Sequence, residues 1–246
     1  METGIFLQAR TSSSRFPGKV LEKIDNTPLF LFIAKNLKKN FKNTIVLTSK
    51  NKKDEKIKKL CKLNKLKCFR GSLDNVLKRF YDANKKYNFD NIVRITGDCP
   101  FSDNRLIKEV LSNHIKNKND YTSNVLKLTF PQGLDVEIFT KQTLNKIYTF
   151  AKKRSEKEHV TLFLRNNQNL FKCKNIFYKE NLSNIRLTVD YKEDLKLMNL
   201  IFIYLKRNKK KVSLKNIIRF LKKNPKLMDF EKLNKKNKFI KYLKSY

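Results

Sequence analysis

Short apolar runs alternate with segments of helical periodicity from the start of the chain to Asp98. The runs are rich in Ile, Val and Phe, which is typical of buried strands, while the segments between them repeat apolar residues at three- and four-residue spacing. The expected strands are Gly4–Ala9, Thr44–Thr48, Lys67–Phe69 and Asn91–Thr96, and the expected helices are Pro28–Lys39, Lys52–Lys65 and Asp74–Tyr87. Pro28 suits a first helical turn, and Asp74 suits an N-cap. This alternation predicts an α/β fold with a mostly parallel, doubly wound sheet.

The pattern becomes mixed after Asp98. The expected elements there are a helix Asn104–Lys116, short strands near Asp120–Asn124 and Val136–Phe139, and helices from Lys141 and Ser155. We interpret about 120–170 as a small inserted subregion that covers the sheet. The alternation of apolar runs and helical segments then returns, with an expected strand Asn184–Val189 and expected helices Lys192–Lys206 and Ser213–Lys223. Without an internal repeat or a Gly/Pro-rich linker, the sequence predicts one domain over residues 1–233, followed by a Lys/Asn-rich tail, 234–246, that is expected to fray.

The sequence also indicates the cellular compartment. The sequence contains no run of about 18 apolar residues, so no membrane span is expected. The first residues lack the basic and apolar regions of a signal peptide. Four cysteines are scattered, without metal-binding spacing to His114 or His159. We therefore expect reduced thiols in a cytoplasmic protein.

The net charge of +35 is compatible with a nucleic-acid partner. However, only 11 of the 57 basic residues are Arg, and they occur with 28 Asn. Proteins that read bases and phosphates favour the bidentate Arg fork. A compositional bias of the coding sequence therefore explains the charge better than specific nucleic-acid binding, although a basic nucleic-acid-binding protein remains an alternative.

A cationic loop follows the first expected strand. The stretch QARTSSSRFPGK carries Arg10, Arg15 and Lys19 around four hydroxyl side chains, and Gly18 permits a tight backbone. Exposed backbone N–H groups after a first strand are natural anion sites, and Arg and Lys bind phosphate oxygens. The chain contains neither a P-loop nor a dinucleotide fingerprint. We expect this loop to bind a triphosphate, the alternative being a solvated basic loop.

Two carboxylates end expected strands. Asp98 follows an apolar strand and precedes Cys99-Pro100, which should end that strand sharply. Asp190 also stands between an apolar run and a helix. Either carboxylate could help to hold Mg²⁺ on substrate phosphates. The alternative for both is a helix cap, although Asp103 is better placed to cap the helix after Asp98.

An ordered set of motifs resembles the sugar-acid cytidylyltransferases, which make CMP-activated ulosonic and sialic acids, and especially the branch called spore coat polysaccharide biosynthesis protein F. The motifs cover nearly the whole chain and stop before the tail: QARTSSSRFPGKVLEKIDNTPLF, FRGSLDNVLKRFYDA, VRITGDCPFSD, FPQGLDVEIF, SEKEHVTLFLRN, RLTVDYKEDLKL and VSLKNIIRFLKKNPKLM. The resemblance implies the nucleotide-diphospho-sugar transferase fold, which is like that of the A-type glycosyltransferases. One departure is TSSS in the opening loop, where relatives more often carry a Gly before the Ser.

The resemblance also implies roles for individual residues. Asp98 and Asp190 would hold the catalytic Mg²⁺, and Arg10, Lys19 and Asp98 would be the catalytic residues. The implied nucleotide-binding residues are Gln8, Ala9, Arg10, Arg15, Lys19, Arg70, Ser72 and Asp74, and the implied substrate-binding residues are Gln132, Gly133, Asp135, Glu158 and His159. Structural alternatives remain for several of them: Arg79, beyond the Arg70 motif, could be a solvated helix residue, Gln132-Gly133 a simple β-turn, and His159 a structural histidine.

The resulting hypothesis is a cytidylyltransferase that transfers CMP from CTP to a sugar acid, releases pyrophosphate and serves surface polysaccharide biosynthesis. We expect no specific nucleic-acid partner, and a homodimer formed through the inserted region is a further expectation from the resemblance. A nucleotide-sugar-dependent glycosyltransferase is the alternative enzyme. Such enzymes usually carry an Asp-x-Asp metal site, whereas GDCP offers a single Asp.

Overall fold

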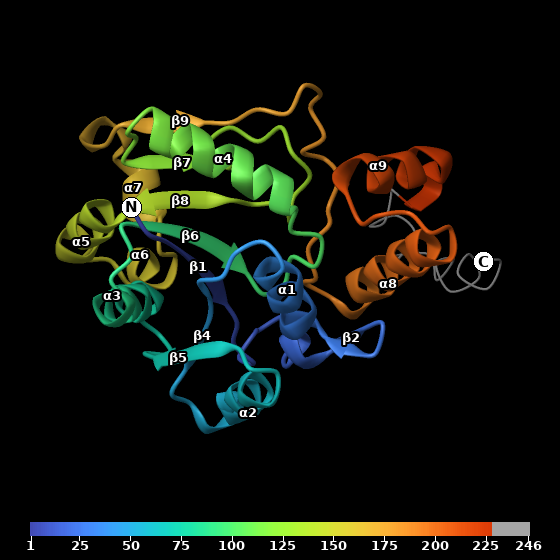
Figure 1. The fold of residues 1–246 in the computed structure, drawn as a ribbon, viewed down its shortest axis with the longest axis horizontal. Helices are drawn as coiled ribbons and strands as arrows, with labels where there is room; N and C mark the ends of the chain where they lie inside the picture. The colour runs from blue at the N-terminus through green and yellow to red at the C-terminus, as the bar shows by residue number, and fades with distance from the viewer. Residues whose placement is uncertain (228–246) are drawn as a thin grey trace.

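A seven-stranded sheet forms the centre of the computed structural model, which describes residues 1–227 (Figure 1). Its strand order is β5-β4-β1-β6-β8-β7-β9. These strands are β1 (Thr3–Gln8), β4 (Thr44–Ser49), β5 (Lys67–Gly71), β6 (Asn91–Thr96), β7 (Tyr121–Ser123), β8 (Glu137–Thr140) and β9 (Cys173–Asn175), while β2 (Lys23–Ile24) and β3 (Thr27–Pro28) form a separate hairpin. The predicted tail and the predicted domain end at residue 233 lie outside the described residues.

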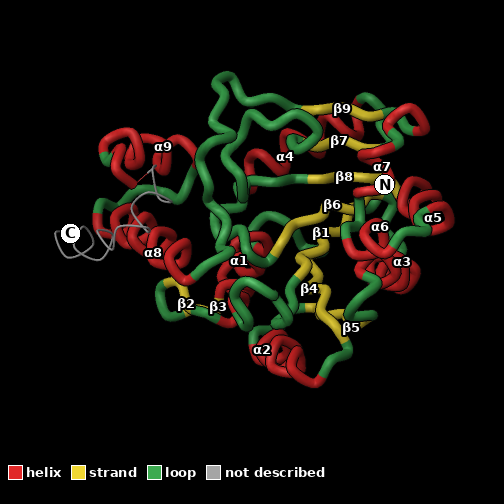
Figure 2. The backbone as a smooth tube through the Cα atoms, turned by 180° about the vertical axis from the view of Figure 1, so that it is seen from behind, coloured by secondary structure: helices red, strands yellow, loops and turns green. Residues whose placement is uncertain are grey.

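Helices cover both faces of the sheet, as Figures 1 and 2 show. The α-helices are α1 (Leu29–Lys38), α2 (Glu55–Leu63), α3 (Val76–Tyr87), α4 (Asn104–Lys116), α5 (Lys141–Phe150), α6 (Arg154–Glu158), α7 (Leu162–Asn166), α8 (Lys192–Arg207) and α9 (Leu214–Lys223). The 3₁₀ turns are η1 (Lys19–Leu21), η2 (Lys52–Asp54), η3 (Gln168–Leu170) and η4 (Pro225–Leu227).

Alternate residues of β1 explain the two layers. Ile5 and Leu7 pack with α1, α2, α4, α8 and α9 in one buried cluster, whereas Phe6 packs with α3 and α5 in another. Successive strand residues point to opposite faces, so a strand that is apolar throughout must be covered on both sides. The predicted mostly parallel, doubly wound α/β fold is confirmed: β5, β4, β1 and β6 are parallel neighbours.

The sheet changes direction after β6. Strand β8 runs antiparallel to β6, β7 runs antiparallel to β8, and β9 is parallel to β7. The region interpreted as an insertion therefore extends the sheet at one end through β7 and β8, and α5 lies over the same face as α3 (Figure 1).

The predicted strand Asn184–Val189 is wrong. In that segment only Arg186 forms a β-bridge, with Gln132. The segment alternates buried and half-buried residues, as a strand does, but its backbone bonds go to a loop: Leu187 N–H donates to the Gln132 carbonyl at 2.7 Å. Gly133 permits this close approach, because its φ is +97° and a Cβ there would lie 2.6 Å from the Leu187 backbone. The segment ends beside β6, where Val189 N–H donates to the Asp98 carbonyl at 2.9 Å.

The predicted start of α4 is confirmed, whereas those of α1 and α3 differ: Pro28 precedes α1 as its N-cap, with ψ 136°, and is not part of the first helical turn. Asp103 caps α4 as predicted, and Ser213 caps α9. Helix α3 begins two residues later than predicted, because the Asn75 side chain, and not Asp74, accepts from Lys78 N–H. Asp74 is exposed.

Through residue 227, no helix combines the length and the apolar character that crossing a membrane requires.

Candidate active site

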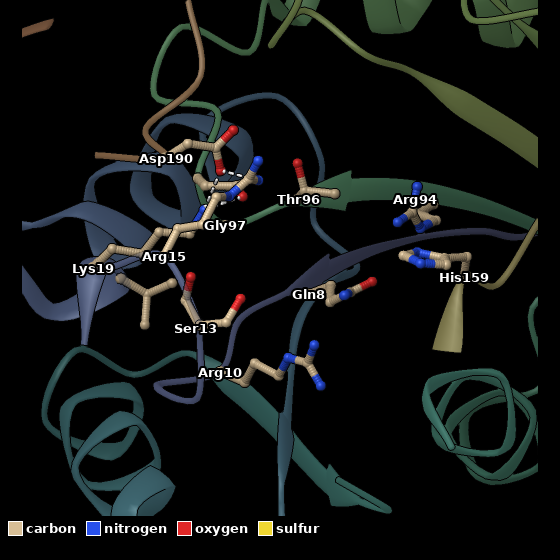
Figure 3. Close-up of a pocket in the computed structure, with 13 residues that line it drawn as sticks. Gln8, Arg10, Ser13, Arg15, Lys19, Arg94, Thr96, Gly97, His159 and Asp190 are labelled. Carbon is tan, nitrogen blue, oxygen red and sulfur yellow. Dashed lines mark hydrogen bonds and ion pairs between the residues drawn. The ribbon is translucent and has the colours of Figure 1, made fainter. Parts of the chain in front are cut away.

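A pocket of about 340 Å³ opens at the carboxyl ends of β1 and β6 (Figure 3). Open α/β sheets bind ligands at this edge, and the volume lies within the range of small-molecule sites. The lining residues are Gln8, Arg10, Ser13, Ser14, Arg15, Lys19, Val20, Arg94, Thr96, Gly97, Asp98, His159 and Asp190. The cavity thus brings together Arg10, Arg15 and Lys19 with Asp98 and Asp190.

The Lys19 ammonium joins the two carboxylates. Its Nζ donates to Asp98 Oδ2 at 2.7 Å, to Asp190 Oδ1 at 3.0 Å and to the Val189 carbonyl at 2.7 Å. Burial alone would lower the pKa of Lys19, but the charges of Asp98 and Asp190 outweigh burial and raise it. Lys19 is therefore a fixed positive charge at this end of the pocket.

Asp98 is held as an ionised carboxylate. Burial would raise the pKa of Asp98, but Lys19 outweighs that effect and the pKa lies below its usual range. The strand brings the side chain to the pocket: Arg94, Thr96 and Asp98 share one face of β6 and its end, because strand side chains alternate between faces.

Asp190 faces the pocket and does not cap α8. Arg15 forms an ion pair with Asp190 Oδ1 at 2.8 Å, and the same oxygen accepts a hydrogen bond from Lys19. Asp194 takes the capping role, since its Oδ2 accepts from Asp190 N–H at 2.7 Å and from Tyr191 N–H at 2.9 Å. The capping alternative raised by the sequence is therefore wrong for Asp190.

Arg10 lies apart from the Lys19 group. Its Nη2 donates to Glu158 Oε1 at 2.9 Å, and this hydrogen bond is the largest of the effects that lower the pKa of Glu158. The structure thus joins a residue expected to bind nucleotide with one expected to bind the acceptor. Figure 3 shows Arg15, Lys19 and Asp190 at one end of the pocket, with Arg94 and His159 at the other.

Several predicted site residues do not line this pocket. Arg70 pairs with Glu55 and donates to the Ser49 carbonyl at 2.9 Å, so its guanidinium is already engaged. Ser72 accepts from Asn75 N–H at 3.1 Å at the start of α3.

The FPQGLD residues also lie outside the pocket lining. Gln132 is exposed and donates to the Ser183 carbonyl at 3.1 Å. Asp135 is half-buried, and its pKa is raised by burial and by the neighbouring Glu137 charge.

Two arginines were misjudged from sequence. Arg79 is fully buried, not solvated, and its Nη1 donates to the Ser72 carbonyl at 3.0 Å. Arg94 was not singled out at all, yet it lines the pocket and pairs with the buried Glu137. A cation inside the apolar strand NIVRIT, four residues before Asp98 and on the same face, was the signal available in the sequence.

The fold and the pocket define a class: an α/β sheet with cations and paired carboxylates gathered at its carboxyl edge, as nucleotidyltransferases require. A cytidylyltransferase from Leptospira borgpetersenii has a solved structure that matches with a TM-score of 0.87 and 32% identity, over 93% of this chain and 97% of that one. The predicted nucleotide-diphospho-sugar transferase type of fold is confirmed.

Sequence comparisons identify the family within this class. The family model described as Cytidylyltransferase matches residues 5–240, and the chain belongs to this family. An uncharacterized protein of Methanocaldococcus jannaschii is 39% identical, with 90% of each chain covered. The spore coat polysaccharide biosynthesis protein SpsF of Bacillus subtilis is 30% identical, over 89% of this chain and 93% of its own length. The chain is therefore a CTP-dependent nucleotidyltransferase, and the alternative of a glycosyltransferase is not supported.

Proposed function

We propose that this enzyme transfers CMP from CTP to a sugar acid, an ulosonic or nonulosonic acid, and releases pyrophosphate, in the biosynthesis of a surface polysaccharide. The observation that carries the proposal is the convergence of Lys19, Asp98 and Asp190: one ammonium lies within hydrogen-bond distance of both carboxylates, at the pocket wall. The motif resemblance supports the sugar acid, and the polysaccharide role named for the Bacillus relative supports the pathway class.

The cations of the opening loop suit a triphosphate. Arg10, Arg15 and Lys19 line one cavity from three positions of a single loop, and a triphosphate offers anionic oxygens over a comparable span. In the proposed reaction a hydroxyl oxygen of the acceptor attacks the α-phosphorus in line, and the bond from that phosphorus to the bridging oxygen breaks. Lys19 would stabilise the charge that develops on the departing pyrophosphate, and Arg15 would help to bind the triphosphate.

The carboxylates fit a divalent cation that the substrate completes. Lys19 binds Oδ2 of Asp98, and Lys19 and Arg15 share Oδ1 of Asp190. One oxygen of each acid is therefore not bound by these two cations. Oδ1 of Asp98 contacts the weakly donating Cys99 thiol at 3.6 Å. Within residues 1–227 no group of three or more His, Cys, Asp or Glu could hold a metal, so a fully protein-enclosed site is not available there.

Mg²⁺ suits this arrangement, because it commonly takes one or two carboxylates and completes its shell with phosphate oxygens and water. Asp98 and Asp190 would hold it, and when bound it would supply Lewis-acid polarisation of the α-phosphate. Lys19 would keep the two acids in place before the nucleotide arrives.

The acceptor would approach from the His159 side of the pocket. Glu158 is tied to Arg10, which lines the same cavity as His159, so the two substrates would meet near this pair. Gln132, Gly133 and Asp135 stay a prediction for the acceptor side, as the Mg²⁺ requirement, cytoplasmic location and homodimer do for the enzyme as a whole.

The test is a matrix of substrates with purified enzyme and Mg²⁺. Each of the four ribonucleoside triphosphates is incubated with ulosonic acids, nonulosonic acids and, as a matched set, sugar 1-phosphates, while pyrophosphate release is measured. We expect release with CTP and a sugar acid, and a CMP-sugar by mass spectrometry. Release with sugar 1-phosphates alone would overturn the sugar-acid acceptor, and the absence of release with CTP and every sugar acid would count against it as well.

A further inference from the structure

Asp54 is a buried carboxylate behind the cationic loop, and nothing in the sequence singled it out. Only 1% of the residue is exposed, and it stands at the end of η2, directly before α2. Its Oδ1 accepts from the backbone N–H of Thr11 at 2.8 Å and from the Thr11 hydroxyl at 2.6 Å. Its Oδ2 accepts from the backbone N–H of Ser49 at 3.3 Å and from the Ser49 hydroxyl at 2.5 Å. One carboxylate therefore ties the loop to the carboxyl end of β4.

Thr11 is the residue on which the loop closes. Its carbonyl accepts from Ser13 N–H at 3.0 Å and from Gly18 N–H at 2.8 Å, so the loop returns to Thr11 at Gly18. Gly18 has φ +78°, a left-handed conformation that glycine adopts without strain, and Lys19 follows it directly. Arg10 precedes Thr11 in the chain. A shift of Thr11 would therefore move the backbone that carries both Arg10 and Lys19.

The charge of Asp54 is maintained in the fold. Burial would raise the pKa of Asp54, but the hydrogen bonds from Ser49 and Thr11 outweigh burial and lower it. Burial and the Arg10 charge lower the pKa of the buried Arg79 guanidinium, whereas the Asp54 charge raises it. Charge-assisted hydrogen bonds are the stronger kind, so the bonds to Thr11 hold the loop more firmly than neutral bonds would.

We propose that Asp54 is a positioning residue that, through Thr11, fixes the Arg10–Lys19 loop in the conformation that receives the triphosphate. The stretch TSSS has no glycine at its start, and its first residue, Thr11, is held by two hydrogen bonds to Asp54. A preorganised loop binds more tightly because less ordering is needed on binding. The inference rests on the proposed assignment of this loop to the triphosphate.

The first test removes the Thr11 hydroxyl and leaves Asp54 charged opposite Arg79. We expect Thr11→Val to raise the Kd of CTP, measured by calorimetry with the full-length enzyme, about tenfold. Thr11→Ser keeps a hydroxyl and should restore the parent Kd. Thr143→Val is the matched control, since Thr143 is a buried threonine at the start of α5 that hydrogen-bonds Thr140 and the Asp120 carbonyl, away from the pocket. It should lower stability without changing the Kd of CTP.

The second test is a double-mutant cycle of Asp54→Asn with Arg10→Ala, read as the Kd of CTP. If Asp54 acts by placing Arg10, the double variant should bind CTP no more than about threefold weaker than the weaker single variant, a deviation from additivity expected for coupled residues. If the effects of the two single substitutions on the Kd of CTP are independent and multiply in the double variant, the inference is overturned. Parent-like CTP binding by Thr11→Val would overturn it as well. Parent-like binding by Arg10→Ala would instead refute the assignment of the loop to the triphosphate, so the two failures are distinguishable.

Discussion

Two ion clusters border the pocket, and they differ in how completely the oxygens of their carboxylates are occupied. In the cluster of Arg94 and Glu137, Oε1 of Glu137 accepts from Arg94, and Oε2 accepts from the hydroxyls of Tyr121 at 2.6 Å and Thr161 at 2.5 Å. In the cluster of Lys19, Asp98 and Asp190, each acid keeps one oxygen that Lys19 does not bind. The first cluster is closed and joins β6 to β8; the second is open toward the cavity.

The difference indicates separate roles. A buried carboxylate whose oxygens are all occupied can bind nothing further, and breaking its ion pair is strongly destabilising. A carboxylate with an oxygen directed at a cavity can accept a ligand. We therefore assign the Glu137 cluster mainly to the fold and the Asp98 cluster to the reaction, and four predictions test this comparison.

Asp98→Asn should have the largest effect. Loss of the negative charge removes a ligand for the proposed cation and one of the two carboxylates that hold Lys19, and we expect kcat to fall by about 10³-fold or more, equivalent to about 4 kcal/mol. Pyrophosphate release at saturating CTP measures it. Asp103→Asn, at the exposed cap of α4, is the control and should retain kcat. A parent-like kcat for Asp98→Asn would refute the metal role.

Glu137→Gln should act on stability instead. Arg94 would lose its charged partner in a buried setting, and we expect the free energy of unfolding in urea to fall by about 3 kcal/mol. The Kd of CTP for the folded variant should change by less than about threefold. Unchanged stability with a collapse of turnover would place Glu137 in the reaction and remove the distinction between the clusters.

Acid should weaken the closed cluster in a defined direction. Burial alone would raise the pKa of Glu137, but the Arg94 charge and the Thr161 and Tyr121 hydroxyls outweigh it, so the folded pKa lies below that of the unfolded chain. The resulting stabilisation is present at neutral pH and is lost as the pH falls through the folded pKa. Between pH 7 and acidic pH, Glu137→Gln should lose less unfolding free energy than the parent. Parallel curves for the two proteins would contradict this.

Arg15→Ala should have the smallest effect. The Arg15 side chain is 55% exposed, and exposed ion pairs contribute little and are screened by salt. We expect the KM of CTP to rise about threefold at low salt, with kcat nearly unchanged. The ratio of variant to parent KM should approach one as salt is added. A large, salt-independent loss of kcat would make Arg15 part of the reacting group.

Sequence periodicity was sufficient for the parallel half of the fold, because β1, β4, β5 and β6 are apolar runs between amphipathic helices. It failed at Asn184–Val189, where alternating burial arises from a loop-to-loop contact and not from a sheet. Alternation reports which side chains face inward, and it does not report which backbone supplies the hydrogen bonds.

The site was predictable only where side chains follow strand ends. Lys19 and Asp98 come together because they follow the neighbouring parallel strands β1 and β6, whereas Asp190 reaches them through the loop contact of Val189 with Asp98. Arg70 is absent from the pocket because Glu55 binds it, and ion pairs between distant segments leave no periodic signal. The role of Asp54 could not be predicted either, because it depends on contacts with Thr11 in the opening loop and with Ser49 at the end of β4, which leave no periodic signal.

The backbone contact that joins Val189 to Asp98 also has a consequence for synthesis of the protein. Val189 N–H donates to the Asp98 carbonyl at 2.9 Å, and the Val189 carbonyl accepts from Lys19 at 2.7 Å. The segments around residues 19, 98 and 189, which are far apart in the sequence, are thereby joined at one point. A product terminated before residue 190 would keep the four parallel strands but would lack Asp190, one of the two acids assigned to the proposed cation.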